Sequence, residues 1–288
     1  MRQTALVAVL VAALSASATP AFAMDWGNVL KGAEAAGTEL TKAASAFTIS
    51  QAEEVAIGQS IHDEILKESP ALDNAGVQAY VKQVGDRLAA QAKTPYTYTF
   101  TVINSDEVNA FAAPGGFVFV TTGALRLMTT EAQLAGVLGH EVAHVAKRHG
   151  IEGIKKAMLA QSAVAGIAGA NEGSGIRGEL VKVATKFGMD LVLKGFDRAA
   201  ESESDDFGAK YAAGAGYDPK GIEEFLTTLG QHAGDGPVWL MPVASHPRSD
   251  DRVKALAAKR PAAPSAPVVG AKDYQRRVLA VIGAAGKQ

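Results

Sequence analysis

The chain has 288 residues, of which 48% are apolar and 20% charged, so it is long and apolar enough to bury a globular core. Its 28 basic and 30 acidic residues give a net charge of −2 without a basic run, which argues against a nucleic-acid partner. The absence of cysteine excludes thiolate metal ligands, disulfides and a lipid-modified cysteine.

The N-terminal residues predict export. Arg2 supplies positive charge, and Ala5–Leu14 is an unbroken apolar run of the length typical of a signal-peptide core. Pro20 follows, and Ala21-Phe22-Ala23 fits the small-x-small rule for cleavage. A run of about 10 to 12 apolar residues is too short to span a bilayer, which disfavours an uncleaved membrane anchor. We therefore predict a signal peptide over residues 1–23 and a periplasmic location, with secretion as the alternative.

The first elements after the signal peptide are predicted from composition and periodicity. Residues 24–50 are rich in Ala, Gly and Thr without clear periodicity, which indicates a loose leader or a weakly packed helix. Apolar residues at helical spacing predict helices over Glu53–Ser69 and Asn74–Gln91. The Thr, Tyr and Val content of Tyr96–Ile103 predicts a strand, and the apolar run Phe117–Val120 after a Pro-Gly-Gly turn predicts a second, buried strand.

The next predicted element is a helix with recognisable ends. Thr130 followed by Gln133 is a capping-box pattern, which marks the start of a helix. Lys147, Arg148 and then Gly150 form a pattern typical of a helix end.

The segment His-Glu-Val-Ala-His inside this helix predicts a metal site. His140 and His144 are four residues apart and differ by only about 40° around a helix axis, so both imidazoles project from one face and can bind one metal. Glu141, next to the first histidine, can reach a water on that metal. This arrangement suits a Zn²⁺ that acidifies its water and a carboxylate that takes the proton.

A catalytic zinc site needs a third protein ligand. The pattern HExxHxxGxxH would place it on the same segment, but the chain has Lys147 and Gly150 where that pattern needs Gly and His. His149 lies five residues after His144, about 140° around a continuing helix, so we expect it to face away as a helix-end or surface residue.

Downstream carboxylates are the remaining candidates for the third ligand. Glu201 and Asp205 share one face of a predicted helix, so Glu201 can bind the metal while Asp205 hydrogen-bonds the free ring nitrogen of a histidine ligand. Glu203 points to the opposite side and is the poorer candidate. The alternative interpretation is a solvated acidic helix face.

Two later segments carry weaker patterns. Met158–Ala170 is apolar but short, and we favour a partly buried helix or lid over a surface element that touches a membrane or covers the active site. Residues 259–288 are predicted to be a Pro/Ala-rich linker with a short basic helix at Lys272–Val281.

Taken together, these motifs resemble the HtpX-type, CAAX-protease-type and BepA-type zinc metallopeptidase family of gluzincins. The matching residues, in chain order, are Asn109-Ala110-Phe111, Pro114-Gly115-Gly116, Thr122-Gly123-Ala124-Leu125, Glu131, Leu134, Gly139 to His144, Glu201-x-x-x-Asp205, Ala215 to Pro219, Ser245-His246-Pro247 and Arg252. The spanning helices of HtpX and the CAAX proteases and the helical repeats of BepA are not found in this sequence. The chain is therefore most similar to compact periplasmic members of LoiP and YcaL type, without their lipid-bearing cysteine.

The resemblance implies a fold and a metal site. The fold is expected to be α+β and zincin-like, mostly helical with a small sheet packed beside the metal helix, and to occupy residues 51–258. His140, His144 and Glu201 are expected to hold one Zn²⁺ per chain. Glu141 is expected to act as the catalytic base, and Asp205 to support a histidine ligand.

The resemblance also implies roles around the metal. Asn109-Ala110-Phe111 corresponds to the edge strand that receives the peptide, an ordinary core strand being the alternative. His246 is expected near the metal, where it either donates to the developing oxyanion or occupies the fourth zinc position and keeps the enzyme latent. Arg252 either supports the oxyanion or pairs with an acid such as Asp205 or Asp250.

The predicted function is a zinc-dependent endopeptidase that acts on misfolded or misassembled cell-envelope proteins. Its predicted partners are unfolded polypeptides and a membrane surface in peripheral contact, with no nucleic acid; oligomeric state is not predicted. The alternative is a chaperone-like binding protein for outer-membrane proteins with little or latent proteolysis. A purely structural zinc is disfavoured, because such sites usually fill all four positions with Cys or His and the chain has no Cys.

Overall fold

The computed structural model of the protein describes residues 48–160, 174–233, 250–265 and 274–285. The predicted signal peptide, most of the leader, most of Met158–Ala170, and His246 lie outside these residues.

Two capped helices begin the described chain. Helix α4 (Gln51–Glu68) starts at Ser50, whose side chain accepts from the Glu53 backbone N–H while the Glu53 carboxylate accepts from the Ser50 N–H. Helix α5 (Ala75–Ala92) starts at Asn74, whose side chain caps the Val77 N–H. Both helices confirm the predictions from periodicity, with ends shifted by one or two residues.

A small mixed sheet follows. Its strands are β1 (Thr99–Ile103), β2 (Ala110–Ala113) and β3 (Phe117–Thr121), in the order β1-β3-β2, with β3 parallel to β1 and antiparallel to β2. The turn η1 (Pro114–Gly116) connects β2 to β3. Strands β1 and β3 confirm the two predicted strands, and β2 lies at an edge of the sheet.

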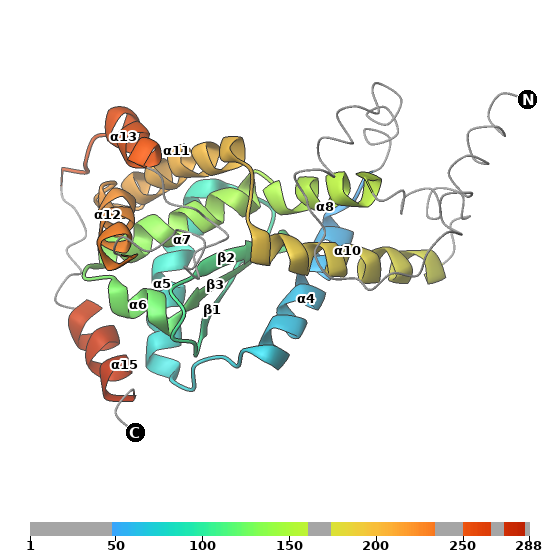
Figure 1. The fold of residues 1–288 in the computed structure, drawn as a ribbon, viewed down its shortest axis with the longest axis horizontal. Coiled ribbons are helices and arrows are strands. Elements are labelled where there is room, and N and C mark those ends of the chain that lie inside the picture. The colour runs from blue at the N-terminus through green and yellow to red at the C-terminus, as the bar shows by residue number, and fades with distance from the viewer. Residues whose placement is uncertain (1–47, 161–173, 234–249, 266–273, 286–288) are drawn as a thin grey trace, which may run out of the picture.

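The metal helix α7 (Glu131–Ala146) lies at the centre of the molecule (Figure 1). Fourteen of its sixteen residues are buried, so it is covered on nearly every side, unlike a surface helix with one apolar stripe. It is preceded by α6 (Thr122–Leu127) and packs against α5, the sheet, α11 (Arg198–Gly214) and α12 (Gly221–Ala233).

The start of α7 follows the capping prediction with one difference. The Thr130 side chain accepts from the Gln133 N–H as expected. The Gln133 side chain, however, accepts from the backbone N–H of Thr129 and so reaches one residue further back than a capping box requires.

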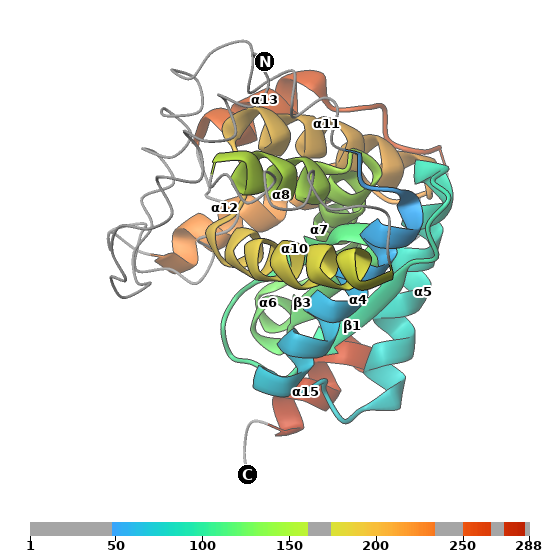
Figure 2. The ribbon, with the colours of Figure 1, turned by 90° about the vertical axis from the view of Figure 1, so that its right-hand side faces the viewer.

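Alternating side chains divide the core between the two faces of the sheet. Val118 and Val120 of β3 point into the cluster that includes α5, α7, α11 and α12. Phe117 and Phe119 point into a second cluster with α4, α8 (His149–Ala160) and α10 (Ser174–Lys194). Figure 2 shows these last three helices together on one side of the molecule. The period of two along β3 is that of a strand buried on both faces.

The C-terminal elements pack on the first of these clusters. Helix α13 (Asp250–Lys259) lies against α11 and α12, and the π-helical turn η3 (Gln275–Leu279) leads into α15 (Ala280–Ala285). The buried Tyr274 donates its hydroxyl proton to the carbonyl of Leu125 at 2.6 Å, and Val278 and Ile282 belong to the same core.

This architecture confirms the expected fold class: α+β, mostly helical, with a small sheet beside the metal helix. Within the described part of the chain, no helix combines the length and the apolarity needed to cross a bilayer.

Candidate metal centre

Two glycines let α7 and α11 cross closely enough to build a site between them. A Cβ atom added to Gly208 would lie 2.7 Å from the His140 backbone nitrogen, and one added to Gly139 would lie 2.9 Å from the Gly208 carbonyl oxygen. Real Cβ atoms do not approach that closely, so a side chain at either position would push the helices apart. The close crossing brings Glu201 and Asp205 of α11 against His140.

Three side chains converge at this crossing. The Nε2 atoms of His140 and His144 are 3.0 Å apart, and the Glu201 carboxylate oxygens lie 3.5 and 3.3 Å from them. All three residues are buried, and their candidate ligand atoms lie within 4.8 Å of one another. Two imidazoles and one carboxylate form a donor set typical of catalytic zinc sites, in which water fills the fourth position. The residues present therefore fit a Zn²⁺ ion.

The charges around His140 favour a cation at this place. Burial lowers the pKa of His140, but hydrogen bonds and charge from Asp205 and Glu201 outweigh burial and raise that pKa to about 10 in the metal-free protein. The two carboxylates thus stabilise positive charge between them, as they would stabilise a metal ion.

Asp205 and Arg252 hold the outer side of His140. Asp205 Oδ1 lies 3.0 Å from His140 Nδ1. Burial alone would raise the pKa of Asp205, but Arg252 and His140 together lower it below its usual value. The ionised carboxylate can therefore accept the Nδ1 proton of His140, which leaves Nε2 free to face the metal. Asp205 thus lies beside a histidine of the candidate metal centre, on the face of α11 that it shares with Glu201.

Arg252 of α13 joins Asp205 to Glu201. Its Nε and Nη2 atoms donate to the two Asp205 oxygens at 2.9 and 2.7 Å, and its Nη1 lies 2.9 Å from Glu201 Oε2. Of the two expected roles for Arg252, the structure contains the ion pair with Asp205. The guanidinium also lines the pocket beside His140, where the role in oxyanion support stays a prediction.

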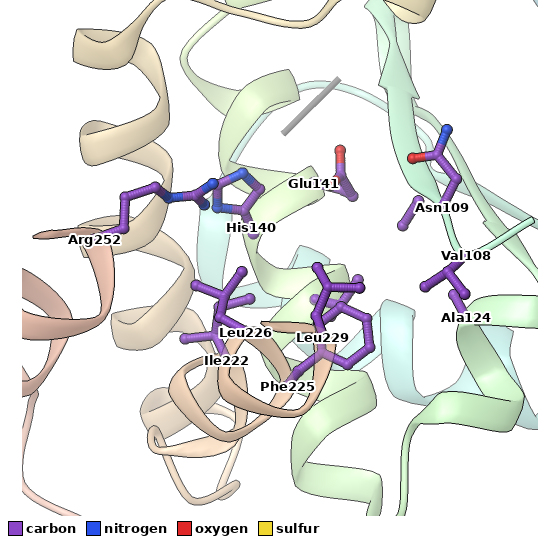
Figure 3. Close-up of a pocket in the computed structure, with 12 residues that line it drawn as sticks. Val108, Asn109, Ala124, His140, Glu141, Ile222, Phe225, Leu226, Leu229 and Arg252 are labelled. Atoms are coloured by element: carbon purple, nitrogen blue, oxygen red, sulfur yellow. The ribbon is translucent and has the colours of Figure 1, made fainter. Parts of the chain in front are cut away.

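Glu141 projects into a pocket between this ion-pair cluster and the sheet. Figure 3 shows Arg252 and His140 on one side of the pocket and Val108 and Asn109 on the other, with Glu141 between them. Apolar side chains of α12 close the remaining side; they are Ile222, Phe225, Leu226 and Leu229. A carboxylate in so apolar a pocket can exchange a proton with a reacting group away from bulk water.

The three predicted substrate-binding residues divide between the pocket and the core. Asn109 precedes β2, and its carbonyl accepts from the Thr121 N–H at 3.0 Å. Asn109 and Ala110 line the pocket. The Phe111 ring instead stacks on Phe119, with ring centroids 4.9 Å apart, and belongs to the core. Among the described strands, none pairs with the outer edge of β2.

The expectation that His149 faces away from the metal site is wrong. Its Nδ1 atom lies 3.0 Å from Nδ1 of His144. Helix α7 ends at Ala146, and Arg148 adopts a left-handed backbone conformation with φ of 57°, so the chain turns back before α8 begins at His149. The angle of 140° assumed one continuing helix. The helix-end pattern at Lys147, Arg148 and Gly150 was the signal that this assumption fails.

Phe196 is a second contact that the sequence did not reveal. It lies between α10 and α11, after Gly195 with φ of 81°, and its ring stacks on His144 with centroids 4.1 Å apart and an interplanar angle of 21°. No pattern around Phe196 marks it, because the contact depends on how two distant helices are connected. His246 lies outside the described residues, so its two expected roles stay predictions.

Comparison with known proteins bears on this site. The sequence model of Peptidase family M48 matches residues 75–260, which include the three candidate ligands, Glu141, Asp205 and Arg252. The chain belongs to this family. Among its relatives, the Beta-barrel assembly-enhancing protease of Escherichia coli (strain K12) is 29% identical over 236 residues, which are 78% of this chain and 45% of that protein.

Two further relatives have different names and come from other organisms. The Mitochondrial metalloendopeptidase OMA1 of Arabidopsis thaliana is 31% identical over 66% of this chain and 38% of its own length. A Protease HtpX homolog of Desulfatibacillum aliphaticivorans is 30% identical over 60% of each chain. The M48 chain thus spans less than half the length of the first two of these relatives. The resemblance predicted from the motifs is confirmed.

Proposed function

We propose that the chain is a zinc-dependent endopeptidase. The observation that carries this proposal is the convergence of His140, His144 and Glu201 beside Glu141, in a pocket bordered by an edge strand. Membership of Peptidase family M48 supports the same activity.

The proposed mechanism assigns the proton transfers to Glu141. A Zn²⁺ held by His140, His144 and Glu201 would supply Lewis acidity and lower the pKa of water to about 7. Glu141 takes the proton from the attacking water and later delivers it to the leaving amine. Asp205 keeps His140 in the tautomer that the site needs, and the apolar side chains of α12 exclude bulk water from the reacting groups.

The proposed peptide site is the outer edge of β2. In an antiparallel ladder, successive residues alternate between pairing with the neighbouring strand and directing their N–H and C=O groups outward. Because Asn109 pairs with Thr121, Ala110 and Ala112 are the residues expected to face outward. Main-chain pairing there would bind an extended polypeptide with little dependence on sequence, and the adjoining apolar pocket would favour an apolar side chain.

We further propose that the substrates are misfolded or misassembled cell-envelope proteins, met in the periplasm after cleavage of the signal peptide. A relative named for enhancing β-barrel assembly supports this substrate class. An extended strand site also favours it, since only an unfolded segment can pair along β2.

The experiment that tests the activity is casein cleavage by purified protein and by Glu141→Gln, with zinc content measured in both. We expect zinc in both proteins and a loss of cleavage of about 10²- to 10⁴-fold in the variant. Zinc in both with equal casein binding and cleavage in neither would instead support the chaperone-like alternative or latency. Absence of zinc from both would contradict the proposal.

The proposal for His246 is tested by its alanine variant. Faster cleavage by His246→Ala would support a latent state that His246 maintains, and slower cleavage would support assistance to the transition state. Unchanged cleavage would remove both roles.

A further inference from the structure

The outer side of His144 is held differently from that of His140. We propose that His149 is a positioning residue that, together with Glu203, holds His144 in the tautomer that presents its Nε2 atom to the metal. The inference rests on the proposed zinc site and assigns its second histidine a partner that neither the motif nor the family match names.

The ring nitrogen of His144 that faces the site is Nε2. His144 Nε2 lies 3.0 Å from His140 Nε2 and 3.3 Å from Glu201 Oε1, so Nε2 is the nitrogen available to a metal. A neutral imidazole that binds metal through Nε2 carries its proton on Nδ1. That proton needs an acceptor, and His149 Nδ1 lies 3.0 Å away.

The other contacts of His149 determine whether its Nδ1 atom can accept. His149 Nε2 lies 3.0 Å from Glu203 Oε2, a carboxylate oxygen that can only accept while it is ionised. The ring proton of a neutral His149 therefore belongs on Nε2, which leaves Nδ1 as an acceptor. The Ser204 hydroxyl lies 3.3 Å from the same Nδ1 atom, but that nitrogen has a single lone pair, which the shorter contact from His144 occupies. The contacts to His144 and Glu203 are both consistent with the same tautomer of His149, in which Nε2 carries the proton and Nδ1 does not.

Glu203 is held in the ionised form that this arrangement needs. Lys147 Nζ lies 2.9 Å from Glu203 Oε1. An ammonium group this close favours the carboxylate over the carboxylic acid. The hydrogen bonds therefore run from His144 to His149 and from His149 to Glu203.

Arg148 explains why His149 can reach this position. Its Nε donates to the buried Glu54 carboxylate at 2.8 Å and its Nη2 to the Ile49 carbonyl at 3.1 Å. These contacts hold a non-glycine residue in the left-handed conformation, which is otherwise strained. The turn that returns His149 toward His144 is therefore stabilised by contacts outside the site.

The first test determines the tautomers in the full chain loaded with zinc. Two-bond ¹H–¹⁵N correlations distinguish a protonated ring nitrogen from an unprotonated one. We expect a proton on Nε2 and none on Nδ1 of His149, and a proton on Nδ1 of His144. A proton on Nδ1 of His149, in either a neutral or a doubly protonated ring, would overturn the proposal because two donors would then face each other.

The second test compares two variants in zinc affinity, measured by competition with a chelator. His149→Ala removes the acceptor and should weaken zinc binding by about 10- to 100-fold. In His149→Asn the side-chain oxygen takes the place of Nδ1, so most of that loss should be recovered. Equal zinc affinity of wild type and His149→Ala, or an equal loss in the two variants, would contradict the proposal.

Controls separate this inference from the proposed function. Glu203→Ala should weaken zinc binding less than His149→Ala, and Glu152→Ala, which removes an exposed glutamate of α8 paired with Lys155, should leave it unchanged. If wild type binds no zinc, the proposed function fails and takes this inference with it. If wild type binds zinc and cleaves casein but His149→Ala does so equally, only this inference fails. The tautomer measurement on wild type decides the matter even if a variant does not fold.

Discussion

The two histidines of the M48 site differ in their surroundings: His140 is held by a buried carboxylate, whereas His144 is held through a half-exposed one. On the His140 side, Asp205 contacts the ring directly, and its side chain is only 5% exposed and paired with Arg252. On the His144 side, a second imidazole stands between the ring and Glu203, whose side chain is 42% exposed. The first side lies at a close crossing of two helices, and the second lies at a turn near the surface.

This difference predicts which side determines stability. Removing one partner of a buried ion pair greatly reduces the free energy of unfolding, because the remaining charge stays out of water. Removing one partner of an exposed ion pair changes the free energy of unfolding little, because water replaces that partner. Substitutions on the His140 side should therefore reduce both the free energy of unfolding and zinc affinity, whereas substitutions on the His144 side should act mainly on zinc affinity.

The largest effect is expected for Asp205→Ala. It leaves Arg252 and His140 buried without their carboxylate, which should reduce the free energy of unfolding by about 3 kcal/mol, the lower end for a broken buried pair because Arg252 keeps Glu201. Denaturant unfolding of the metal-free protein measures this loss. The matched control is Asp206→Ala, which removes the partially exposed partner of Lys259 and should cost less than about 1 kcal/mol. Equal losses would show that the His140 side is not the more sensitive one.

The next prediction concerns the pH dependence of stability and again tests the His140 side. The pKa of His140 is raised from 6.5 to about 10 in the metal-free protein. A group whose pKa is higher in the folded state stabilises the fold fully below its unfolded pKa, and this contribution declines as pH rises through the folded pKa. The free energy of unfolding of the metal-free protein should therefore fall as the pH rises from about 6.5 to about 10.

The control for this slope is His140→Gln, which should lack this contribution over the same range. The zinc-loaded wild type should lack it too, because Nε2 of His140 is then engaged by the metal. A metal-free stability that is flat or rises over this range would contradict the assignment of positive charge to His140.

Gly208→Ala tests the close crossing itself. The added Cβ would lie 2.7 Å from the His140 nitrogen, so α11 must move away from α7, at a cost of about 1 to 3 kcal/mol. Zinc affinity should fall as well, since Glu201 and Asp205 move with α11. Gly178→Ala in α10 is the control: nothing lies within 4 Å of its added Cβ, so it should stabilise the helix by about 0.5 to 1 kcal/mol. If Gly208→Ala left the free energy of unfolding unchanged, the crossing of α7 and α11 would be able to accommodate an added methyl group.

The same contrast explains how much of the site the sequence could predict. The spacing of His140 and His144, and of Glu201 and Asp205, sets both faces of the crossing, because helical geometry is local and repeats along the chain. Spacing did not predict which histidine Asp205 would meet, because that depends on how the two helices are oriented where they cross. The residues that form the two faces of this crossing were therefore predictable from local spacing, but their pairing was not.

The His144 side depends on features that periodicity does not encode. His149 reaches the site only because Arg148 takes a left-handed conformation held by Glu54, which lies 94 residues earlier in the chain. Phe196 reaches it through the connection between α10 and α11. The packing of Tyr274 on Leu125 was missed for the same reason, since 149 residues separate them. Such contacts follow from tertiary structure rather than from local pattern.

Arg148 provides a test of that turn. Arg148→Gly loses the contacts to Glu54 and Ile49 but adopts the left-handed conformation without strain, whereas Arg148→Ala loses the contacts and keeps the strain. The glycine variant should therefore be the more stable by about 0.5 to 1 kcal/mol, after allowance for the greater freedom of its unfolded chain. Denaturant unfolding of both variants measures this difference. An alanine variant at least as stable as the glycine variant would argue that the backbone at this turn relaxes.

The smallest effect on stability is expected for Lys147→Ala, at the exposed end of the His144 side. Lys147 pairs with Glu203 and lies over the Phe207 ring, 3.4 Å from its centroid. Its removal should reduce the free energy of unfolding by no more than about 1 kcal/mol, and the loss should shrink as salt is added, because both partners are reached by water. Zinc affinity should fall less than in His149→Ala, since Glu203 can still accept from His149. Unfolding at low and high salt, with zinc competition beside it, measures both quantities. A loss as large as that of Asp205→Ala, and insensitive to salt, would mean that the two histidines are held by equally buried networks.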